Sequence, residues 1–180
     1  GLFMSMIDEL RDIVRSDAVR FGKFILASGK ESDLYVDLRK VTLLPKGAFL
    51  IGSIIYDMIK DRPVEAIGGL TLGADPIAVA TSLIAYQNGR EIAAFLVRKE
   101  KKDHGMKNAV EGPVRSGQKV VIVDDVITSG SSTITAIEQA EAAGLSVDLV
   151  IAVLDRMEGG KANIEALGHE VRTLLTRKDL

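Results

Sequence analysis

The sequence predicts an α/β fold in which a parallel sheet carries helices on both faces. Two observations support this class. Short apolar runs typical of strands alternate along the chain with segments that have helical apolar spacing. The run Val120–Val123 has four consecutive β-branched apolar residues, which is typical of a strand buried on both faces. In such folds ligands bind at the carboxyl ends of the strands.

The elements are expected in a regular order. Met6, Ile7, Leu10, Ile13 and Val14 recur at helical spacing and predict a first amphipathic helix. Pro45 and Pro76 suit the first turn of a helix, and Asp75 is the expected N-cap of the second of these two helices. The expected helices cover residues 5–16, 45–59, 76–86, a segment ending near 143, and 162–167. The expected strands cover residues 21–26, 34–38, 66–70, 92–97, 120–123, 147–154 and 170–175.

The 180 residues are expected to form one domain, because no linker, repeat or low-complexity segment divides them. Roughly residues 1–40, with the first helix and a hairpin around the turn 27–33, are expected to form a small hood over the active site. Residues 98–117 are polar and without apolar periodicity, so a long loop is expected there.

Composition excludes several classes of protein. A net charge of −2 gives no general attraction to nucleic acid or to anionic membranes. The absence of cysteine excludes disulfides, zinc–thiolate sites and a thiol nucleophile. No apolar run has the length of a membrane span and no signal peptide is evident, so we expect the cytoplasm.

The motif that follows the central strand predicts an anion-binding site. Asp124 and Asp125 come where the strand is expected to end, and a run of Thr, Ser and Gly leads into the next helix. Backbone N–H groups of a tight loop and of a helix N-terminus can converge on a phosphate, and Gly130 permits a turn with positive φ. The P-loop lysine is missing. The alternative is an ordinary N-cap after a solvated Asp-Asp turn.

The two acids narrow the choice of ligand. Carboxylates beside a phosphate site repel the anion unless they bind hydroxyl groups or a hard cation such as Mg²⁺. A sugar phosphate satisfies both halves of the motif, with its phosphate in the loop and its ribose hydroxyls on Asp124 and Asp125.

A second charged stretch lies between Arg98 and Lys107, with five positive charges and His104. Charge runs are usually solvated surface loops. A loop of about 20 residues in a compact domain is, however, usually functional and often a lid. With an anion site already indicated, we expect cations that close over a highly charged leaving group and exclude water.

Two further strand ends are candidates for the site. The stretch 68–73, with Gly73 and Thr71, is a plausible second anion cradle, although Gly-rich turns are also common for packing reasons. Arg156 follows a strand and could face the cleft, whereas a lone arginine is otherwise usually at the surface. His169 has no motif around it and is expected to be structural or exposed.

Asp124–Thr133 resembles the phosphoribosyl-pyrophosphate (PRPP) signature of the type I phosphoribosyltransferase family. Within that family, the whole chain is most similar to the orotate phosphoribosyltransferases. The hairpin segments 21–32 and 35–39, the lid segments 98–100 and 102–105, and Leu154-Asp155-Arg156 carry this similarity. Many members have a lysine where this chain has Ala27, and an apolar residue at the position of Asp75. Lys23, Lys30 and Arg39 are the candidates to replace the missing lysine.

The resemblance implies a type I phosphoribosyltransferase fold and the reaction of PRPP with orotate to give orotidine 5′-monophosphate and pyrophosphate. It implies Mg²⁺ bound mainly through PRPP, near Asp124 and Asp125, and a homodimer in which the lid reaches the partner's site. The implied catalytic residues are Asp124, Asp125, Lys99, Lys102 and His104. The implied substrate-binding residues are Arg98, Thr128, Ser129, Gly130, Ser131, Ser132, Thr133, Arg156, Lys23, Tyr35, Thr71 and Gly73.

Two alternatives remain at this point. One is a phosphoribosyltransferase for a purine base, which Ala27 keeps open and the hairpin and Arg156 disfavour. The other is a PRPP-sensing regulator without catalysis, which is expected to add a DNA-binding segment and to lose the lid cations; this chain shows neither change.

Overall fold

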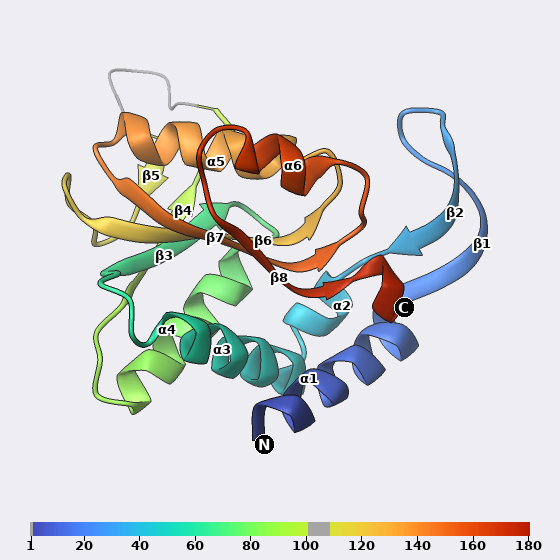
Figure 1. Cartoon of the computed structure of the whole chain (residues 1–180), viewed down its shortest axis with the longest axis horizontal. Helices are drawn as coiled ribbons and strands as arrows, with labels where there is room; N and C mark the ends of the chain where they lie inside the picture. The colour runs from blue at the N-terminus through green and yellow to red at the C-terminus, as the bar shows by residue number, and fades with distance from the viewer. Residues whose placement is uncertain (1, 101–108) are drawn as a thin grey trace.

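The computed structural model describes residues 2–100 and 109–180. A six-stranded sheet with the order β5-β4-β3-β6-β7-β8 forms the centre of the molecule, and all its neighbouring strands are parallel except the pair β4–β5. Helices α1, α3 and α4 lie on one side of the sheet, and α5 and α6 lie on the other (Figure 1). The predicted α/β class with helices on both faces is confirmed.

Helices and strands largely alternate along the body of the chain. The helices of the body are α3 (Pro45–Ile59), α4 (Asp75–Gln87), α5 (Ser131–Ala142), α6 (Gly160–Glu165) and the 3-10 helix η2 (Arg177–Asp179). Its strands are β3 (Ala66–Leu70), β4 (Ala93–Val97), β5 (Val110–Glu111), β6 (Lys119–Ile127), β7 (Ser146–Asp155) and β8 (Val171–Thr176). No helix in the described parts of the chain has the length and apolarity needed to span a bilayer.

The central strands are buried because both of their faces are covered. Val121 and Val123 of β6 belong to the core shared with α1, α3 and α4, whereas Val120 and Ile122 belong to the core shared with α5. This is the period-2 alternation of a strand between two apolar layers. The apolar run at 120–123 therefore correctly indicated a strand buried on both sides.

The expected end of this strand was wrong. The strand β6 continues past both acids to Ile127, and Asp124 is aligned with Ala152 of β7. Backbone pairing with β7 holds this extension, and backbone pairing leaves no trace in an apolar side-chain pattern. Asp124 and Asp125 are consequently fixed on a rigid strand and not in a turn.

Two other expectations also need correction. Asp75 is the first residue of α4 and not its N-cap, which is Ala74; no side-chain hydrogen bond caps this helix. The polar stretch 98–117 is not wholly a loop, because Val110 and Glu111 pair with Val97 and Leu96 as the short edge strand β5. Two residues are too few to show periodicity in a sequence.

The N-terminal segment comprises α1 (Leu2–Ile13), the π-helix η1 (Val14–Ala18), the antiparallel strands β1 (Val19–Ile25) and β2 (Glu31–Val36), and the short helix α2 (Arg39–Thr42). Helix α1 buries Leu10 in the same core as α3. The β1–β2 hairpin projects from the body (Figure 1). Arg177 binds Asp33 of the hairpin at 2.6 Å, so η2 holds the hairpin from the carboxyl end of the chain.

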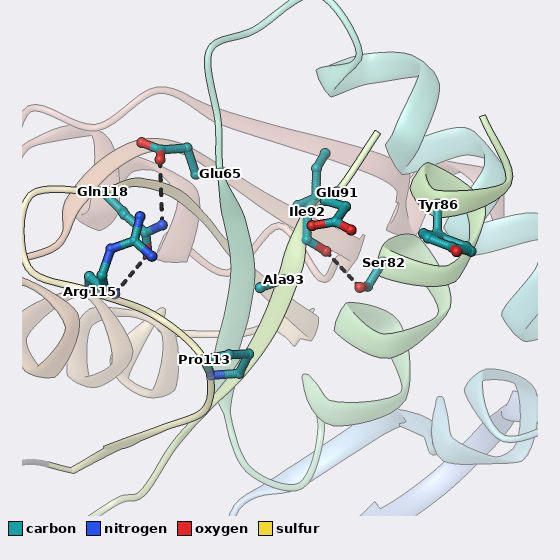
Figure 2. A pocket seen from close by; sticks show the side chains of 9 residues that line it. All are labelled: Glu65, Ser82, Tyr86, Glu91, Ile92, Ala93, Pro113, Arg115 and Gln118. Atoms are coloured by element: carbon teal, nitrogen blue, oxygen red, sulfur yellow. Dashed lines mark hydrogen bonds between the residues drawn. The ribbon is translucent and has the colours of Figure 1, made fainter. Parts of the chain in front are cut away.

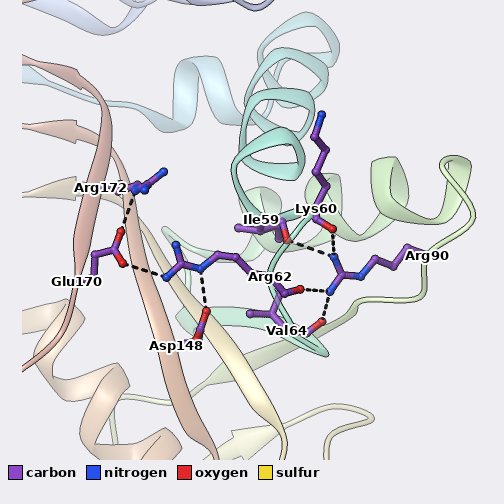
Figure 3. Close-up of polar contacts among 8 residues, drawn as sticks. All are labelled: Ile59, Lys60, Arg62, Val64, Arg90, Asp148, Glu170 and Arg172. Atoms are coloured by element: carbon purple, nitrogen blue, oxygen red, sulfur yellow. Dashed lines mark hydrogen bonds and ion pairs between the residues drawn. The ribbon is translucent and has the colours of Figure 1, made fainter.

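Arginines secure the turn between α3 and β3 (Figure 3). The Arg90 guanidinium donates to four backbone carbonyls, those of Ile59, Lys60, Arg62 and Val64. Ile59 ends helix α3 and Lys60 is its C-cap, so two of these carbonyls lie where a helix leaves carbonyls without intrahelical partners.

Arg62 connects the same turn to the far half of the sheet. Its guanidinium binds Asp148 of β7 at 2.9 Å and Glu170, just before β8, at 3.0 Å (Figure 3). Arg62 and Arg172 lower the pKa of Glu170, since both stabilise its carboxylate by hydrogen bonds. These contacts fix the amino ends of the strands, opposite the edge where the site lies.

Candidate active site

A pocket of about 400 Å³ lies at the carboxyl ends of β3, β6 and β7. The fold thereby brings together segments that are far apart in the sequence, as is usual at this edge of a parallel sheet. The residues lining the pocket are Val36, Asp37, Leu38, Arg39, Leu70, Thr71, Leu72, Gly73, Asp124, Asp125, Val126, Thr128, Ser132 and Arg156. Seven residues proposed from the sequence are in this set.

Asp124 and Asp125 differ in their surroundings. Asp124 is only 6% exposed; its Oδ2 accepts a hydrogen bond from Thr133 Oγ1 at 3.0 Å and its Oδ1 accepts one from the Asp125 N–H at 2.8 Å. Burial, followed by the neighbouring Asp125 carboxylate, raises the pKa of Asp124 to about 8. Asp125 is half-buried, and its Oδ1 accepts from the Val126 N–H at 2.8 Å. One acid is therefore held deep with a raised pKa, while the other meets the pocket.

The loop after β6 forms a separate hollow of about 70 Å³ beside the acids. Gly130 has φ +88°, a left-handed conformation that favours glycine, and it is the N-cap of α5. Ser129 Oγ lies 3.3 Å from the Ser131 N–H and 3.3 Å from its Oγ. Hydroxyl groups and the N-terminus of a helix thus surround one small space, which is the arrangement that binds a phosphate. The residues lining it are Asp124, Val126, Thr128, Ser129, Gly130, Ser131, Ser132 and Thr133.

The start of α6 supports this loop from behind. The Gly160 N–H donates to the Thr128 carbonyl at 3.0 Å, and Asn163 Nδ2 donates to the Ser129 carbonyl at 2.9 Å. A Cβ at Gly160 would lie 2.4 Å from Ile127 Cγ2 and 2.5 Å from Thr128 O, so only glycine allows α6 to approach this closely.

The turn after β3 faces the acids. A Cβ on Gly73 would lie 2.7 Å from Asp125 Oδ1, so the Gly73 backbone is next to that carboxylate. The peptide bond Thr71–Leu72 is cis, and the Thr71 hydroxyl donates to the Asp75 carboxylate. Asp75 thus orients the turn and does not cap the helix.

Arg156 joins the β1–β2 hairpin to the sheet. It is only 8% exposed, and its Nη2 donates to Ser32 Oγ and to the Leu34 carbonyl, both at 3.2 Å. Its Nε donates to Glu158 at 2.8 Å. Nη1 has no hydrogen-bond partner within residues 2–100 and 109–180, and Arg156 lines the pocket. The side chain is held rigidly and still has donors to offer.

Four of the expected residues that the structure describes line neither this pocket nor the hollow beside the acids. Lys23 lines a shallow hollow on the hairpin with Glu31 and Asp33, and Tyr35 lines another beside Arg20, which stacks on its ring at 5.6 Å. Arg98 pairs with Glu111 at 3.2 Å, and Lys99 is exposed. Lys102 and His104 lie outside the described residues.

The sequence reasoning missed that Val36–Arg39, at the base of the hairpin, lines the pocket. Arg39 was considered only as a replacement for a lysine, and Asp37 was given no role. The sequence did contain a pattern that pointed to these residues. In Tyr35-Val36-Asp37-Leu38-Arg39, two charged residues follow a strand and come shortly before a core residue, Val41. Their direction could not be read, because it depends on the short helix α2.

A larger cavity of about 480 Å³ lies at the opposite edge, at the amino ends of β3, β4 and β6 (Figure 2). Three of its polar side chains are engaged within the cavity: Gln118 bridges Glu65 and the Arg115 N–H, and Ser82 donates to the Ile92 carbonyl at 2.6 Å. None of the site residues expected from the sequence lines this cavity.

Within residues 2–100 and 109–180, no group of three or more His, Asp or Glu side chains is placed to hold a metal ion. The pair Asp124–Asp125 nonetheless fits Mg²⁺, which is usually bound through one or two carboxylates together with substrate phosphates.

Known proteins resemble this chain over nearly its full length. Residues 42–167 match the model of the phosphoribosyl transferase domain. An orotate phosphoribosyltransferase of Rhodopirellula baltica is 45% identical over 173 residues, which cover 93% of this chain and 90% of that protein. The crystal structure of the Mycobacterium tuberculosis H37Rv orotate phosphoribosyltransferase in complex with PRPP is similar, with a TM-score of 0.82 and 37% identity, and the match covers 97% of this chain and 98% of that one.

Proposed function

Since the chain belongs to the phosphoribosyl transferase family, among its orotate phosphoribosyltransferases, we propose how its pocket residues divide the work of the reaction. The enzyme transfers the phosphoribosyl group of PRPP to orotate, which gives orotidine 5′-monophosphate and pyrophosphate in pyrimidine biosynthesis. The observation that supports our assignment is the single pocket that joins the acids, the small-residue loop, the Thr71–Gly73 turn and Arg156.

Asp124 and Asp125 bind the ribose hydroxyls. Substitution at the sugar carbon develops positive charge on the ring, as in glycosyl transfer generally. Carboxylates fixed on the rigid strand β6 favour that charge without having to reorganise. The carboxyl group of buried Asp124, which already accepts a hydrogen bond from Thr133, accepts a second one from a ribose hydroxyl. Asp125 contributes the more exposed carboxylate.

The phosphate groups have two separate positions. Residues Thr128–Thr133 hold the 5′-phosphate at the N-terminus of α5, which fixes the distance between the reacting atoms. Thr71 and Gly73, beside Asp125, receive the pyrophosphate end. Mg²⁺, bound mainly by PRPP near the two acids, would share the pyrophosphate charge.

Arg156 binds orotate through its free Nη1 edge, and a guanidinium is the side chain best suited to a carboxylate. Orotate needs no general base if it binds already ionised at nitrogen. Lys99, Lys102 and His104 close over the pyrophosphate, together with Arg98. Lys23 and Tyr35 have the weakest support, because they lie outside the pocket.

We also propose that the enzyme is a homodimer in which each lid serves the partner's site. Val79, Leu83 and Tyr86 lie at helical spacing on α4 and are 47%, 62% and 67% exposed. An apolar stripe of this kind is typical of a surface that a second subunit covers. A cytoplasmic location is proposed as well, since PRPP and orotate are charged and do not cross a bilayer unaided.

An activity screen tests the substrate assignment. Pyrophosphate release is followed with PRPP and, in turn, orotate, uracil, adenine, hypoxanthine and xanthine. We expect turnover with orotate and at least about a hundredfold less with each other base, because none of them pairs a carboxylate with Arg156. Faster turnover with a purine base would refute the assignment.

A further inference from the structure

Two cationic side chains line the pocket within the described residues, Arg156 and Arg39. Three carboxylates also line it: Asp37, Asp124 and Asp125. Both substrates are anions, so the pocket must present positive charge where they bind. Arg156 is buried and already makes three hydrogen bonds, and Arg39 is therefore the cation with the greater remaining capacity.

Asp37 holds Arg39 in place. The Arg39 backbone N–H and its Nε both donate to Asp37 Oδ1, each at 3.2 Å. The side chain of Asp37 is 19% exposed and that of Arg39 is 55% exposed. The hydrogen bond to Asp37 is the largest cause of the raised pKa of the Arg39 guanidinium, and Asp125 adds a smaller contribution across the pocket.

The outer edge of this guanidinium is unused. Neither Nη atom of Arg39 has a hydrogen-bond partner among the residues that the structure describes. An arginine offers five N–H groups in a planar fork, so Arg39 can keep Asp37 and still bind a planar anion through two N–H groups.

The other basic side chains near the hairpin are placed differently. Lys23 lines a hollow on the hairpin itself, Lys30 is exposed beside the hairpin turn, and Lys40 lines the hollow that contains Tyr35. Arg39 alone among these four lines the pocket with the acids.

We propose that Arg39 binds orotate from the hairpin side of the pocket, as a second cation beside Arg156, and that it is a specificity-determining residue for this base. The inference rests on the proposed function, in which the two phosphate groups occupy the α5 loop and the Thr71–Gly73 turn. Arg39 belongs to neither of these segments. It follows the strand whose Leu34 carbonyl accepts a hydrogen bond from Arg156, so the two guanidinium groups flank the hood side of the pocket.

Steady-state kinetics of Arg39→Ala tests the proposal, with Lys40→Ala as the matched control. The control removes one positive charge from the next residue of the same helix, outside the pocket. We expect Arg39→Ala to raise KM for orotate at least tenfold and to change KM for PRPP less than twofold. Arg39→Lys is expected to recover part of the loss, and Lys40→Ala to behave as wild type.

Asp37→Asn provides a second, independent variant. Because Asp37 orients Arg39, we expect a smaller rise in KM for orotate, and no further rise when this change is added to Arg39→Ala. Circular dichroism and thermal unfolding check that each variant is folded. Titration of the same proteins with orotidine 5′-monophosphate and with inorganic pyrophosphate should show weaker binding of the nucleotide alone.

Three results would overturn the inference. A rise in KM for PRPP with no change for orotate would assign Arg39 to the pyrophosphate. Unchanged constants for both substrates would reduce the Asp37–Arg39 pair to a surface ion pair. An equal rise in KM for orotate in Lys40→Ala would mean that the effect comes from the loss of any positive charge in this region and not from a contact of Arg39. If the wild-type protein uses no orotate, the proposed function fails instead, and the nucleotide titration distinguishes that case.

Discussion

Asp124 and Asp125 are neighbours in the chain, and the period-2 geometry of β6 gives them different surroundings. Asp124 points toward Thr133 and the covered side of the strand, where it is buried. Asp125 faces the Gly73 backbone and the pocket. The sequence indicates two acids beside a phosphate loop. Their different burial arises because β6 continues through both of them and directs neighbouring side chains to opposite faces.

We predict that Asp124→Asn and Asp125→Asn each lower turnover more than about tenfold while the fold is retained. Asp125→Asn removes negative charge beside the developing positive ring, and Asp124→Asn replaces one of two carboxyl oxygens that accept hydrogen bonds with a donor. Pyrophosphate release measures the effect. Asp57→Asn, in a surface ion pair of α3 with Lys60, is the matched control and should leave turnover unchanged. Full activity in both variants would mean that the acids are structural.

The raised pKa of Asp124 predicts a dependence of stability on pH. The pKa of Asp124 in the folded state, about 8, exceeds the ordinary aspartate value of 3.8, so the folded state binds this proton more tightly. The resulting stabilisation is complete below about pH 4 and is lost as the pH rises toward about 8. Relative to Asp124→Asn, the wild-type free energy of unfolding should therefore fall across this range by an amount on the order of a few kcal/mol.

Urea unfolding of both proteins between pH 4 and pH 9 measures this difference. Asp125→Asn is an informative companion, because removing the neighbouring carboxylate leaves burial as the main cause that raises the pKa of Asp124. In that variant the pKa of Asp124 should be lower than in the wild type, so the fall in the free energy of unfolding should end at a lower pH. Parallel curves for wild type and Asp124→Asn would contradict a raised pKa.

At the scale of elements, the phosphate loop depends on the helix behind it. Replacing Gly160 with alanine places a methyl group against Ile127 and Thr128, and the loop or α6 must move. We predict a rise of at least about tenfold in KM for PRPP with little change in that for orotate, since a shift of about 1 Å in a positioning element costs this much or more. Glu165→Ala, at the exposed end of α6, is the control. An unchanged KM for PRPP would show that the loop tolerates the displacement.

The sequence allowed the middle of each element to be predicted better than its ends. Strands at 66–70 and 147–154 were located because both of their faces are apolar, and this is a side-chain property. The extension of β6 to Ile127 and the edge strand β5 rest on backbone pairing with β7 and β4. Such pairing depends on neighbours that are distant in the sequence, and it leaves no local pattern.

The same reason explains which parts of the site were found. Thr128–Thr133 form a local motif, so adjacent residues suffice to identify the cradle. Asp37 and Arg39 enter the pocket only because α2 turns the chain after β2, and Arg156 reaches the β1–β2 hairpin only across the fold. Contacts of that length are set by tertiary structure.

At the scale of the whole molecule, the proposed dimer predicts complementation between two inactive variants. Lys102→Ala leaves the acids intact but supplies no cation to its partner, and Asp125→Asn does the reverse. In a mixed dimer one site then combines intact acids with an intact lid. We expect equilibration of the two proteins to restore activity, approaching one working site per heterodimer.

Native mass spectrometry confirms that subunits have exchanged, and wild type mixed with either variant calibrates the activity expected per site. A Leu83→Asp version of both variants, with charge placed in the exposed stripe of α4, should fail to complement because the dimer is weakened. Exchange without recovered activity would mean that each lid acts in its own subunit.

The contacts of Arg90 bear on how this fold can change during evolution. Four carbonyls around the turn 59–64 depend on one planar guanidinium, and a lysine ammonium, with three donors on a single nitrogen, cannot reach all of them. A related protein without this arginine needs a different turn to satisfy the four carbonyls. In a related protein with a longer turn, the arginine can no longer reach all of them. Position 90 and the α3–β3 connection are therefore expected to be inherited as a unit, although about 30 residues separate them in the chain.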